Sequence, residues 1–243
     1  MNAPRFSIIL PCYNEAGTIP SLFARFAEVL GARQDVEVIF VNNGSKDESV
    51  VVMARELEQP GRHFARAVHV AVNQGYGYGI CAGLQEARGE FIGWTHADSQ
   101  YDPAIVLEGY RLLAGAAEPS KTFLQGHRIN RNWFDSFFTA GMTLVARLML
   151  GTDVRDINAQ PKLFPRSFLA QMRNPPKDFS LDLYALFLAR RQGYNVLFLP
   201  VVFGQRLHGE AKGGGSLALK WKLTRRTWAF ISQLRCDIHA GRI

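Results

Sequence analysis

Residues 91–102 read FIGWTHADSQYD, an apolar and β-prone run that ends abruptly in polar side chains. A buried parallel strand has this pattern when it delivers side chains to the carboxyl edge of a sheet. His96, Asp98 and Gln100 would lie at that edge and could share one divalent cation, which suits a phosphate-bearing ligand. The alternative is a strand that ends in an ordinary polar turn.

Upstream of this stretch, three apolar runs each lead into a polar or glycine-rich turn and then into a helix. Gly31 is expected to stop the first helix, and Ser45 with Glu48 forms a capping box that is expected to open the second. This β-α-β-α-β-α-β order predicts a parallel, doubly wound α/β domain with right-handed crossovers. Its polar turns share one edge of the sheet, where ligands bind in such folds. The expected strands are 6–10, 36–41, 65–72 and 91–94, and the expected helices are 19–30, one opened at Ser45, and one after the glycine-rich turn 73–79.

The second half of the chain is less regular. It shows no repeat, linker or low-complexity block, so a single domain is predicted. Residues 1–215 would form that domain, and residues 216–243 would form a basic C-terminal helix that either belongs to it or contacts a membrane surface. The expected elements are a strand at 122–125, helices at 133–150 and 182–192, a polar loop at 156–163, a strand at 196–203 broken by Pro200, a basic loop at 205–215 and a basic helix at 217–235.

The composition narrows the class of protein. The chain has 243 residues, 47% of them hydrophobic, and a formal net charge of +7. This charge favours an anionic partner such as a nucleotide, a lipid phosphate or a membrane surface. No nucleic-acid-binding motif is present, so nucleic acid is not expected as a partner. Three dispersed cysteines, no apolar run of roughly 20 residues and no signal peptide predict a cytoplasmic protein.

The glycine-rich turn at 73–79 invites a dinucleotide-binding interpretation. Its glycines do not follow the G-x-G-x-x-G spacing, and no acidic residue closes a second strand about 20 residues later. A nicotinamide cofactor is therefore not expected. The simpler interpretation is that a helix approaches the sheet closely there and needs small residues.

Four short motifs follow one another on the four expected strand ends. They are Pro11-x-Tyr13-Asn14-Glu15, Asn42-Asn43-Gly44-Ser45, Asn73-x-Gly75-x-Gly77 and Ala97-Asp98-x-Gln100. In this order the sequence resembles family-two glycosyltransferases of GT-A fold, especially dolichyl-phosphate mannosyltransferases and their bacterial polyprenyl-phosphate relatives. The resemblance covers residues 1–215. It implies a single Rossmann-like α/β domain with a mostly parallel central sheet flanked by helices.

The resemblance also implies an activity. A hexosyltransferase of this kind moves a sugar from a nucleotide-diphosphate donor to a polyprenyl or dolichyl phosphate, with inversion and with Mg²⁺ or Mn²⁺ as cofactor. Such an enzyme would lie in the cytoplasm or peripherally at the inner face of a membrane. The residues that match the family's nucleotide-sugar-binding positions are Pro11, Tyr13, Glu15, Asn42, Gly75, Ala97 and Asp98.

The metal motif matches in part. Asp98 and Gln100 correspond to metal ligands of the family, but His96 stands where the family has the first aspartate. Histidine binds divalent metals and suits softer ions than Mg²⁺, so Mn²⁺ is plausible and a weakened site is an alternative. Asn42 and Asn43 replace a pair of aspartates, which leaves the identity of the base open.

Three cations complete the catalytic set that the resemblance implies. Arg206 and Lys212 match a basic pair in a mobile loop that grips the donor diphosphate. Arg128 matches an arginine that binds the acceptor phosphate. The alternative for Arg128 is a structural salt bridge to Asp153 or Asp156.

Two other functions remain open on the sequence. One is a glycosyltransferase that acts on a saccharide hydroxyl and therefore needs a base. The candidate bases are Asp153, Asp156, Asp178 and Asp182, and none lies in an unmistakable base motif. The other is a catalytically weak nucleotide-sugar-binding protein, which the substitutions at residues 42, 43 and 96 would explain.

Overall fold

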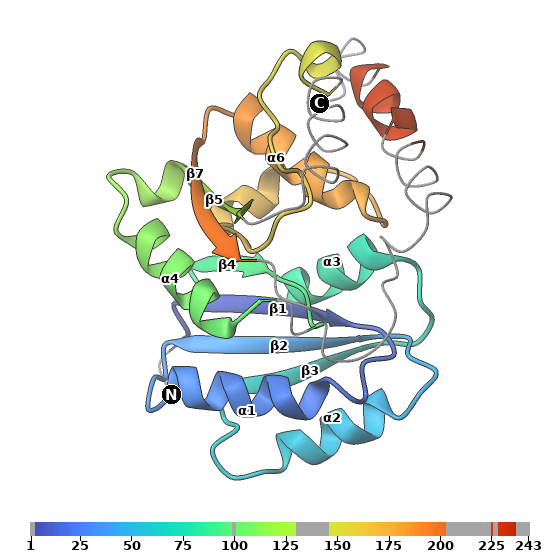
Figure 1. Ribbon diagram of the computed structural model, residues 1–243, viewed down its shortest axis with the longest axis vertical. Helices are drawn as coiled ribbons and strands as arrows, with labels where there is room; N and C mark the ends of the chain where they lie inside the picture. The colour runs from blue at the N-terminus through green and yellow to red at the C-terminus, as the bar shows by residue number, and fades with distance from the viewer. Residues whose placement is uncertain (1–2, 99–100, 130–145, 203–224, 226–227, 237–243) are drawn as a thin grey trace.

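The computed structural model describes residues 3–98, 101–129, 146–202, 225 and 228–236. A seven-stranded sheet of order β3-β2-β1-β4-β6-β5-β7 forms its centre (Figure 1). Only β6 runs antiparallel to its neighbours β4 and β5 among the strands described, so the sheet is mostly parallel, as predicted. The strands are β1 (Phe6–Cys12), β2 (Val36–Asn43), β3 (Ala65–Val70), β4 (Phe91–Trp94), β5 (Thr122–Ile129), β6 (Lys162–Pro165) and β7 (Asn195–Val202).

Helices cover both faces of this sheet and enclose two cores (Figure 1). Side chains alternate between the faces along a strand, so Ile8 and Leu10 of β1 join one core and Ile9 joins the other. One core receives α1 (Ile19–Leu30), α2 (Ser49–Leu57) and α4 (Pro103–Ala114), and the other receives α3 (Tyr76–Glu86) and α6 (Ser180–Arg191). Two short 3-10 helices lie at Pro119–Lys121 and Arg166–Gln171.

The observed helix ends agree only in part with the capping signals in the sequence. Gly31 ends α1 with a φ of 52°, as predicted, since glycine adopts this conformation readily. The predicted capping box at Ser45 was wrong, because α2 begins at Ser49 and Asp47 accepts hydrogen bonds from the Ser49 backbone and hydroxyl. Helix α4 was not predicted, although Asp102 is its N-cap and accepts from the Ala104 N–H at 2.9 Å.

The second half departs more from expectation. Strand β5 extends to Ile129, so Arg128 lies within the strand and not beyond it. Strand β6 begins at Lys162, inside the segment expected to be a loop. Strand β7 continues through Pro200, which is tolerated because β7 is an edge strand. The expected helix at 133–150 lies mostly outside the described residues. Its last five residues, 146–150, are described and are helical.

Close packing explains the glycine-rich turn, in agreement with the simpler interpretation. A Cβ on Gly79 would lie 2.7 Å from the Asn43 side chain, and one on Gly83 would lie 2.6 Å from Ile9. A Cβ on Gly75 would lie 2.3 Å from the Lys177 carbonyl oxygen. Small residues therefore let α3 approach both the sheet and the segment before α6.

The C-terminal helix is described at residues 225 and 228–236. Ile231 and Leu234 are each 1% exposed and join the core that contains Ala146 and Leu150, whereas Trp228 is half exposed. One face of this helix therefore packs on the domain. Within the described part of the chain, no helix has the length and hydropathy needed to cross a bilayer.

Candidate functional site

The loop after β1 carries the first group of predicted donor-binding residues, including Tyr13 and Glu15. Four hydrogen bonds join it to the loop after β2 and to the first residue of α2. The backbone N–H groups of residues 14, 15 and 16 donate to Ser45 Oγ, Ser49 Oγ and Asp47 Oδ2 at 3.1, 2.9 and 3.2 Å. In return, Asn14 Oδ1 accepts from the backbone N–H of residue 46 at 2.8 Å. The two loops thus form one fixed edge, and Asn14 has a φ of 55° within it.

Asp47 joins these loops, and its replacement by alanine should loosen them. Burial alone would raise the pKa of Asp47, but hydrogen bonds from Ser49 and Ala16 outweigh this effect and hold the pKa below its ordinary value of 3.8. A lowered pKa means that the contribution to stability is present above that value and is lost as the pH falls through the folded-state pKa. We expect Asp47→Ala to cost about 1 kcal/mol at neutral pH, the usual net value of a hydrogen bond.

Chemical denaturation at pH 7 and at pH 3 measures this effect. The difference between wild type and Asp47→Ala should shrink at the lower pH, while Asp47→Asn, which keeps one acceptor oxygen, should lose less at pH 7. An equal loss at both pH values would contradict the assignment.

The two asparagines at the end of β2 differ in their contacts. Asn42 is 5% exposed, and its side-chain oxygen accepts from the Ser45 N–H at 3.2 Å. Asn43 donates to the Gly75 carbonyl at 3.0 Å, while its side-chain oxygen has no hydrogen-bond partner among the described residues. The structure therefore brings Asn43 into contact with Gly75, and Asn42 precedes Asn43 at the end of β2. The predicted contact of Asn42 with a base remains a prediction.

The segment after β4 places Ala97 and Asp98 at the same edge, where they are 4% and 5% exposed. His96 lies between two aromatic rings, with centroids 5.7 Å from Tyr76 and 6.1 Å from Tyr101. Burial, followed by the charges of Asp182 and Asp98, raises the pKa of Tyr76 well above its ordinary value. The Tyr76 phenol therefore stays protonated near neutral pH.

The metal-binding prediction concerns the same segment. In the parts of the chain that are described, no three His, Cys, Asp or Glu side chains cluster as a metal site would require. Gln100 lies outside the described residues. A hard cation that completes its shell with phosphate oxygens and water needs only one or two protein ligands. The buried carboxylate of Asp98 fits such a partial site, and His96 lies two residues before it in the chain.

Arg128 lies near the end of β5 and pairs with Asp156. Its backbone N–H donates to Asp156 Oδ2 at 2.7 Å, its Nε donates to Oδ1 at 2.9 Å, and its Nη2 contacts Oδ1 as well. His127 Nδ1 lies 3.5 Å from the same carboxylate. The alternative salt bridge is thus present. The phosphate-binding role of Arg128 remains a prediction, and the remaining N–H groups of its guanidinium could serve it.

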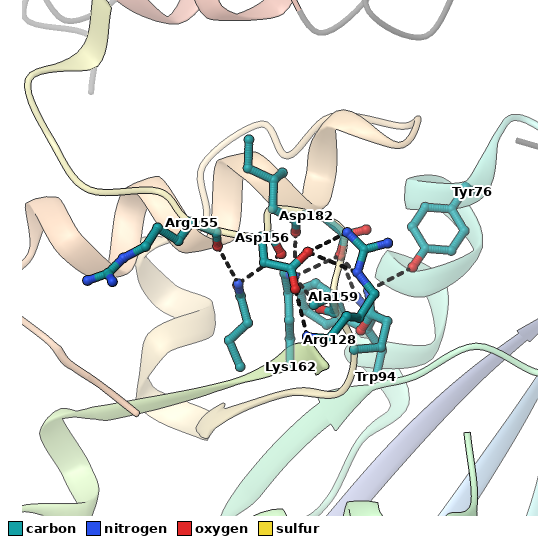
Figure 2. Close-up of polar contacts among 11 residues, drawn as sticks. Tyr76, Trp94, Arg128, Arg155, Asp156, Ala159, Lys162 and Asp182 are labelled. Carbon is teal, nitrogen blue, oxygen red and sulfur yellow. Dashed lines mark hydrogen bonds and ion pairs between the residues drawn. The ribbon is translucent and has the colours of Figure 1, made fainter. Parts of the chain in front are cut away.

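A buried polar network next to this pair was not predicted. Asp182 is 1% exposed and accepts from Trp94 Nε1 at 3.0 Å and from Gln160 Nε2 at 2.8 Å (Figure 2). Lys162, which is fully buried, has its Nζ 3.6 Å from Asp182 Oδ1. Gln160 Nε2 also donates to Tyr76 Oη at 3.3 Å. The sequence signal was a lysine between apolar residues, which was assigned to a loop.

Burial lowers the pKa of Lys162, and the neighbouring Asp182 charge opposes that effect. Asp182 thus acts as a buried hydrogen-bond acceptor for Trp94 and Gln160 and as the counter-charge of Lys162. Of the other candidate bases, Asp153 pairs with Arg155 at 2.8 Å and Asp178 accepts from the Ser180 N–H at 2.9 Å. The predicted diphosphate-binding residues Arg206 and Lys212 lie outside the described residues.

Comparison with known proteins gives a consistent result. The model of glycosyl transferase family 2 matches residues 7–189. An undecaprenyl-phosphate 4-deoxy-4-formamido-L-arabinose transferase of Enterobacter sp. (strain 638) is 27% identical over 216 residues, which are 86% of this chain and 62% of that protein. An uncharacterized glycosyltransferase of Bacillus subtilis is 32% identical over 105 residues, which are 43% of this chain and 32% of that protein.

Solved structures share the fold. Glucosyl-3-phosphoglycerate synthase from Mycobacterium tuberculosis, in complex with Mn²⁺, uridine diphosphate and glucosyl-3-phosphoglycerate, aligns with a TM-score of 0.71 at 19% identity over 96% of this chain and 80% of that one. A mannosyltransferase from Pyrobaculum calidifontis, in complex with GDP-mannose and Mn²⁺, aligns with a TM-score of 0.67 at 19% identity, over 93% of this chain and 61% of that one.

The sheet order, the polar strand ends and these matches define an α/β protein of GT-A fold. The chain belongs to glycosyl transferase family 2. It spans 62% of the length of the curated Enterobacter relative.

Proposed function

We propose that the chain transfers a sugar from a nucleotide-diphosphate donor to a polyprenyl phosphate. The observation that carries this proposal is that two carboxylates in the second half of the chain are buried and already hydrogen-bonded or paired. Asp182 accepts hydrogen bonds from Trp94 and Gln160 and is buried, while Asp156 is paired with Arg128. These carboxylates are poorly suited to take a proton from a hydroxyl. A phosphate acceptor needs no base, because its oxygen is already anionic near neutral pH.

Positioning then becomes the main task of the site. Arg128 would orient the acceptor phosphate by charged hydrogen bonds, so that an oxygen faces the sugar carbon for displacement with inversion. At the same edge of the sheet, near β1 and β2, the fixed loops at Tyr13 and Asn42 would hold the nucleoside. Asp98 would hold a divalent cation, Mg²⁺ or Mn²⁺, with Gln100 and His96 assisting; when bound, this cation would neutralise charge on the leaving diphosphate.

Arg206 and Lys212 belong to the same proposal. Two cations that close over the diphosphate would stabilise the negative charge that grows as the sugar leaves. Their replacement should therefore lower turnover more than donor affinity.

A donor panel with and without acceptor tests the function. Purified protein is incubated with Mn²⁺ or Mg²⁺ and each of several nucleotide-diphosphate sugars, in the presence of undecaprenyl phosphate, a simple saccharide or buffer. Sugar transfer that depends on the polyprenyl phosphate supports the proposal. Transfer to the saccharide supports the hydroxyl-acceptor alternative, and nucleotide binding without turnover supports a binding protein.

The basic C-terminal helix suggests that the protein binds its lipid-linked acceptor at a membrane surface. Residues 217–243 contain six lysine and arginine residues and one acidic residue, Asp237, and Trp228 is half exposed on the helix whose Ile231 and Leu234 pack inward. Exposed cations with an aromatic side chain are typical of a helix at an anionic membrane surface. We expect the protein to cosediment with vesicles of anionic lipid at low salt and to be released at high salt, because counterions screen this attraction. Vesicles of neutral lipid are the control, and the absence of cosedimentation at low salt would remove the peripheral location at the inner membrane face.

A further inference from the structure

Two buried side chains donate hydrogen bonds to the loop that carries Asp156. Gln125 of β5 and Lys162 of β6 are register partners, and both are 0% exposed. Gln125 Nε2 donates to the carbonyl oxygens of Arg155 and Asp156 at 2.8 and 3.1 Å. Lys162 Nζ donates to the carbonyl oxygens of Ile157 and Ala159 at 2.8 and 2.9 Å. The neighbouring strands therefore hold four carbonyl groups of residues 155–159.

The loop needs such external support. Asp156 has a φ of 47°, in the left-handed region that non-glycine residues rarely adopt. A turn bond from the Ala159 N–H to the Asp156 carbonyl oxygen, at 2.9 Å, closes the loop on itself. Strain of this kind persists only where surrounding contacts over-determine the backbone. The donors on Gln125 and Lys162 supply those contacts.

The held loop in turn orients Arg128. The Asp156 carboxylate is 6% exposed and accepts from both the backbone N–H and the guanidinium of Arg128. Its position depends on the backbone of residue 156, and the direction of the guanidinium depends on the carboxylate (Figure 2). Gln125 and Lys162 are thus connected to Arg128 through one loop, although neither contacts it in the described structure.

Packing alone does not account for a lysine at position 162. A fully buried ammonium is costly unless it is paired and hydrogen-bonded. Here Asp182 supplies the opposite charge at 3.6 Å, and the two loop carbonyls accept the hydrogen bonds. An apolar side chain of similar length would fill the space without this cost. The ammonium is therefore explained by the carbonyl groups that it holds.

We propose that Gln125 and Lys162 are positioning residues of the acceptor site, which fix the 155–159 loop and thereby aim Arg128 at the acceptor phosphate. The inference rests on the proposed function, because it assumes that Arg128 binds that phosphate. It assigns a role to two residues that do not themselves touch the substrate.

The test uses variants that remove the hydrogen bonds to the 155–159 loop without leaving an unpaired buried charge. Gln125→Met removes the donor to two carbonyls, and the double variant Lys162→Met/Asp182→Asn removes the buried ion pair as a unit. Each should raise the KM for undecaprenyl phosphate by about tenfold or more, since a misplacement of ~1 Å can cost on the order of 10²-fold. Nucleotide-diphosphate affinity, measured by calorimetry, should remain unchanged. Phe168→Leu, a change in the core at a fully buried residue that packs on Phe123 and Phe164, is the stability-matched control and should lower Tm without altering this KM.

A double-mutant cycle separates positioning from general damage. Adding Gln125→Met to Arg128→Ala should change the acceptor KM little beyond Arg128→Ala alone, because the residues act through one another. Fully additive effects would overturn the positioning role. So would an unchanged KM in Gln125→Met beside a raised KM in Arg128→Ala. An unchanged KM in Arg128→Ala itself would overturn the proposed acceptor site and the inference with it.

Discussion

Replacing Asp98 by alanine should abolish metal-dependent binding of a nucleotide-diphosphate donor. Asp98 is a buried carboxylate four residues after the end of β4, at the same edge of the sheet as the loops after β1 and β2. Few protein ligands hold a cation that is shared with a diphosphate, so the loss of one carboxylate removes much of its coordination. We expect a loss of at least about 10²-fold in donor affinity, above the 10- to 100-fold typical of outer-shell partners.

Calorimetry of nucleotide-diphosphate binding with and without Mn²⁺ measures this loss. Wild type should bind more tightly with the metal, and Asp98→Ala should bind equally weakly in both conditions. Asp35→Ala is a suitable control, because Asp35 pairs with Arg33 just before β2, at the opposite end of that strand from the site. Unchanged affinity of Asp98→Ala in the presence of metal would remove Asp98 from the donor site.

Replacing Arg128 by alanine should sharply lower transfer to polyprenyl phosphate while donor binding continues. Hydrogen bonds to charged groups contribute about 1.5–3 kcal/mol each, so the loss of the guanidinium should lower kcat/KM for the acceptor by about 10- to 100-fold or more. The change also removes the guanidinium that pairs with the buried Asp156 carboxylate, and breaking a buried ion pair in this way destabilises a protein by about 3–5 kcal/mol. Loss of transfer could then reflect unfolding.

Two further variants separate these effects. Arg128→Ala/Asp156→Asn removes both charges and should recover stability without recovering transfer. Arg128→Lys keeps the charge but not the planar fork, so it should retain part of the transfer and bind the acceptor less tightly. The pH–rate profile of wild type should show no single aspartate acting as a titrating base. Efficient transfer to a neutral sugar hydroxyl, abolished by Asp156→Asn or Asp182→Asn with donor binding intact, would instead establish the hydroxyl-acceptor function.

Much of the N-terminal half could be predicted from the sequence. Strands and helices alternate there with regular periodicity, and each element is long enough to show it. The capping box at Ser45 was wrong because Ser45 accepts a hydrogen bond from the backbone N–H of Asn14, which is distant in the sequence. Helix α4 was missed even though Asp102 and Pro103 form a recognisable N-terminal signal.

The structure of the second half of the chain could be predicted only in part. Strand β6 has four residues and begins with a buried lysine, so its apolar pattern is too short and too interrupted to indicate a strand. Its antiparallel pairing with β4 and β5 also breaks the β-α alternation that guided the first half. The polar network around Asp182 was missed for the same reason.

The sequence by itself determined the α/β class, the four polar strand ends and the placement of Asp98 at the carboxyl edge of the parallel strands. These features follow from local periodicity and from the parallel order of the strands, which places successive turns together. The tertiary structure alone decided that Arg128 pairs with Asp156 and that Lys162 is buried beside Asp182. Local patterns cannot specify which of several distant charges become partners, because burial and geometry select the pair only after the chain has folded.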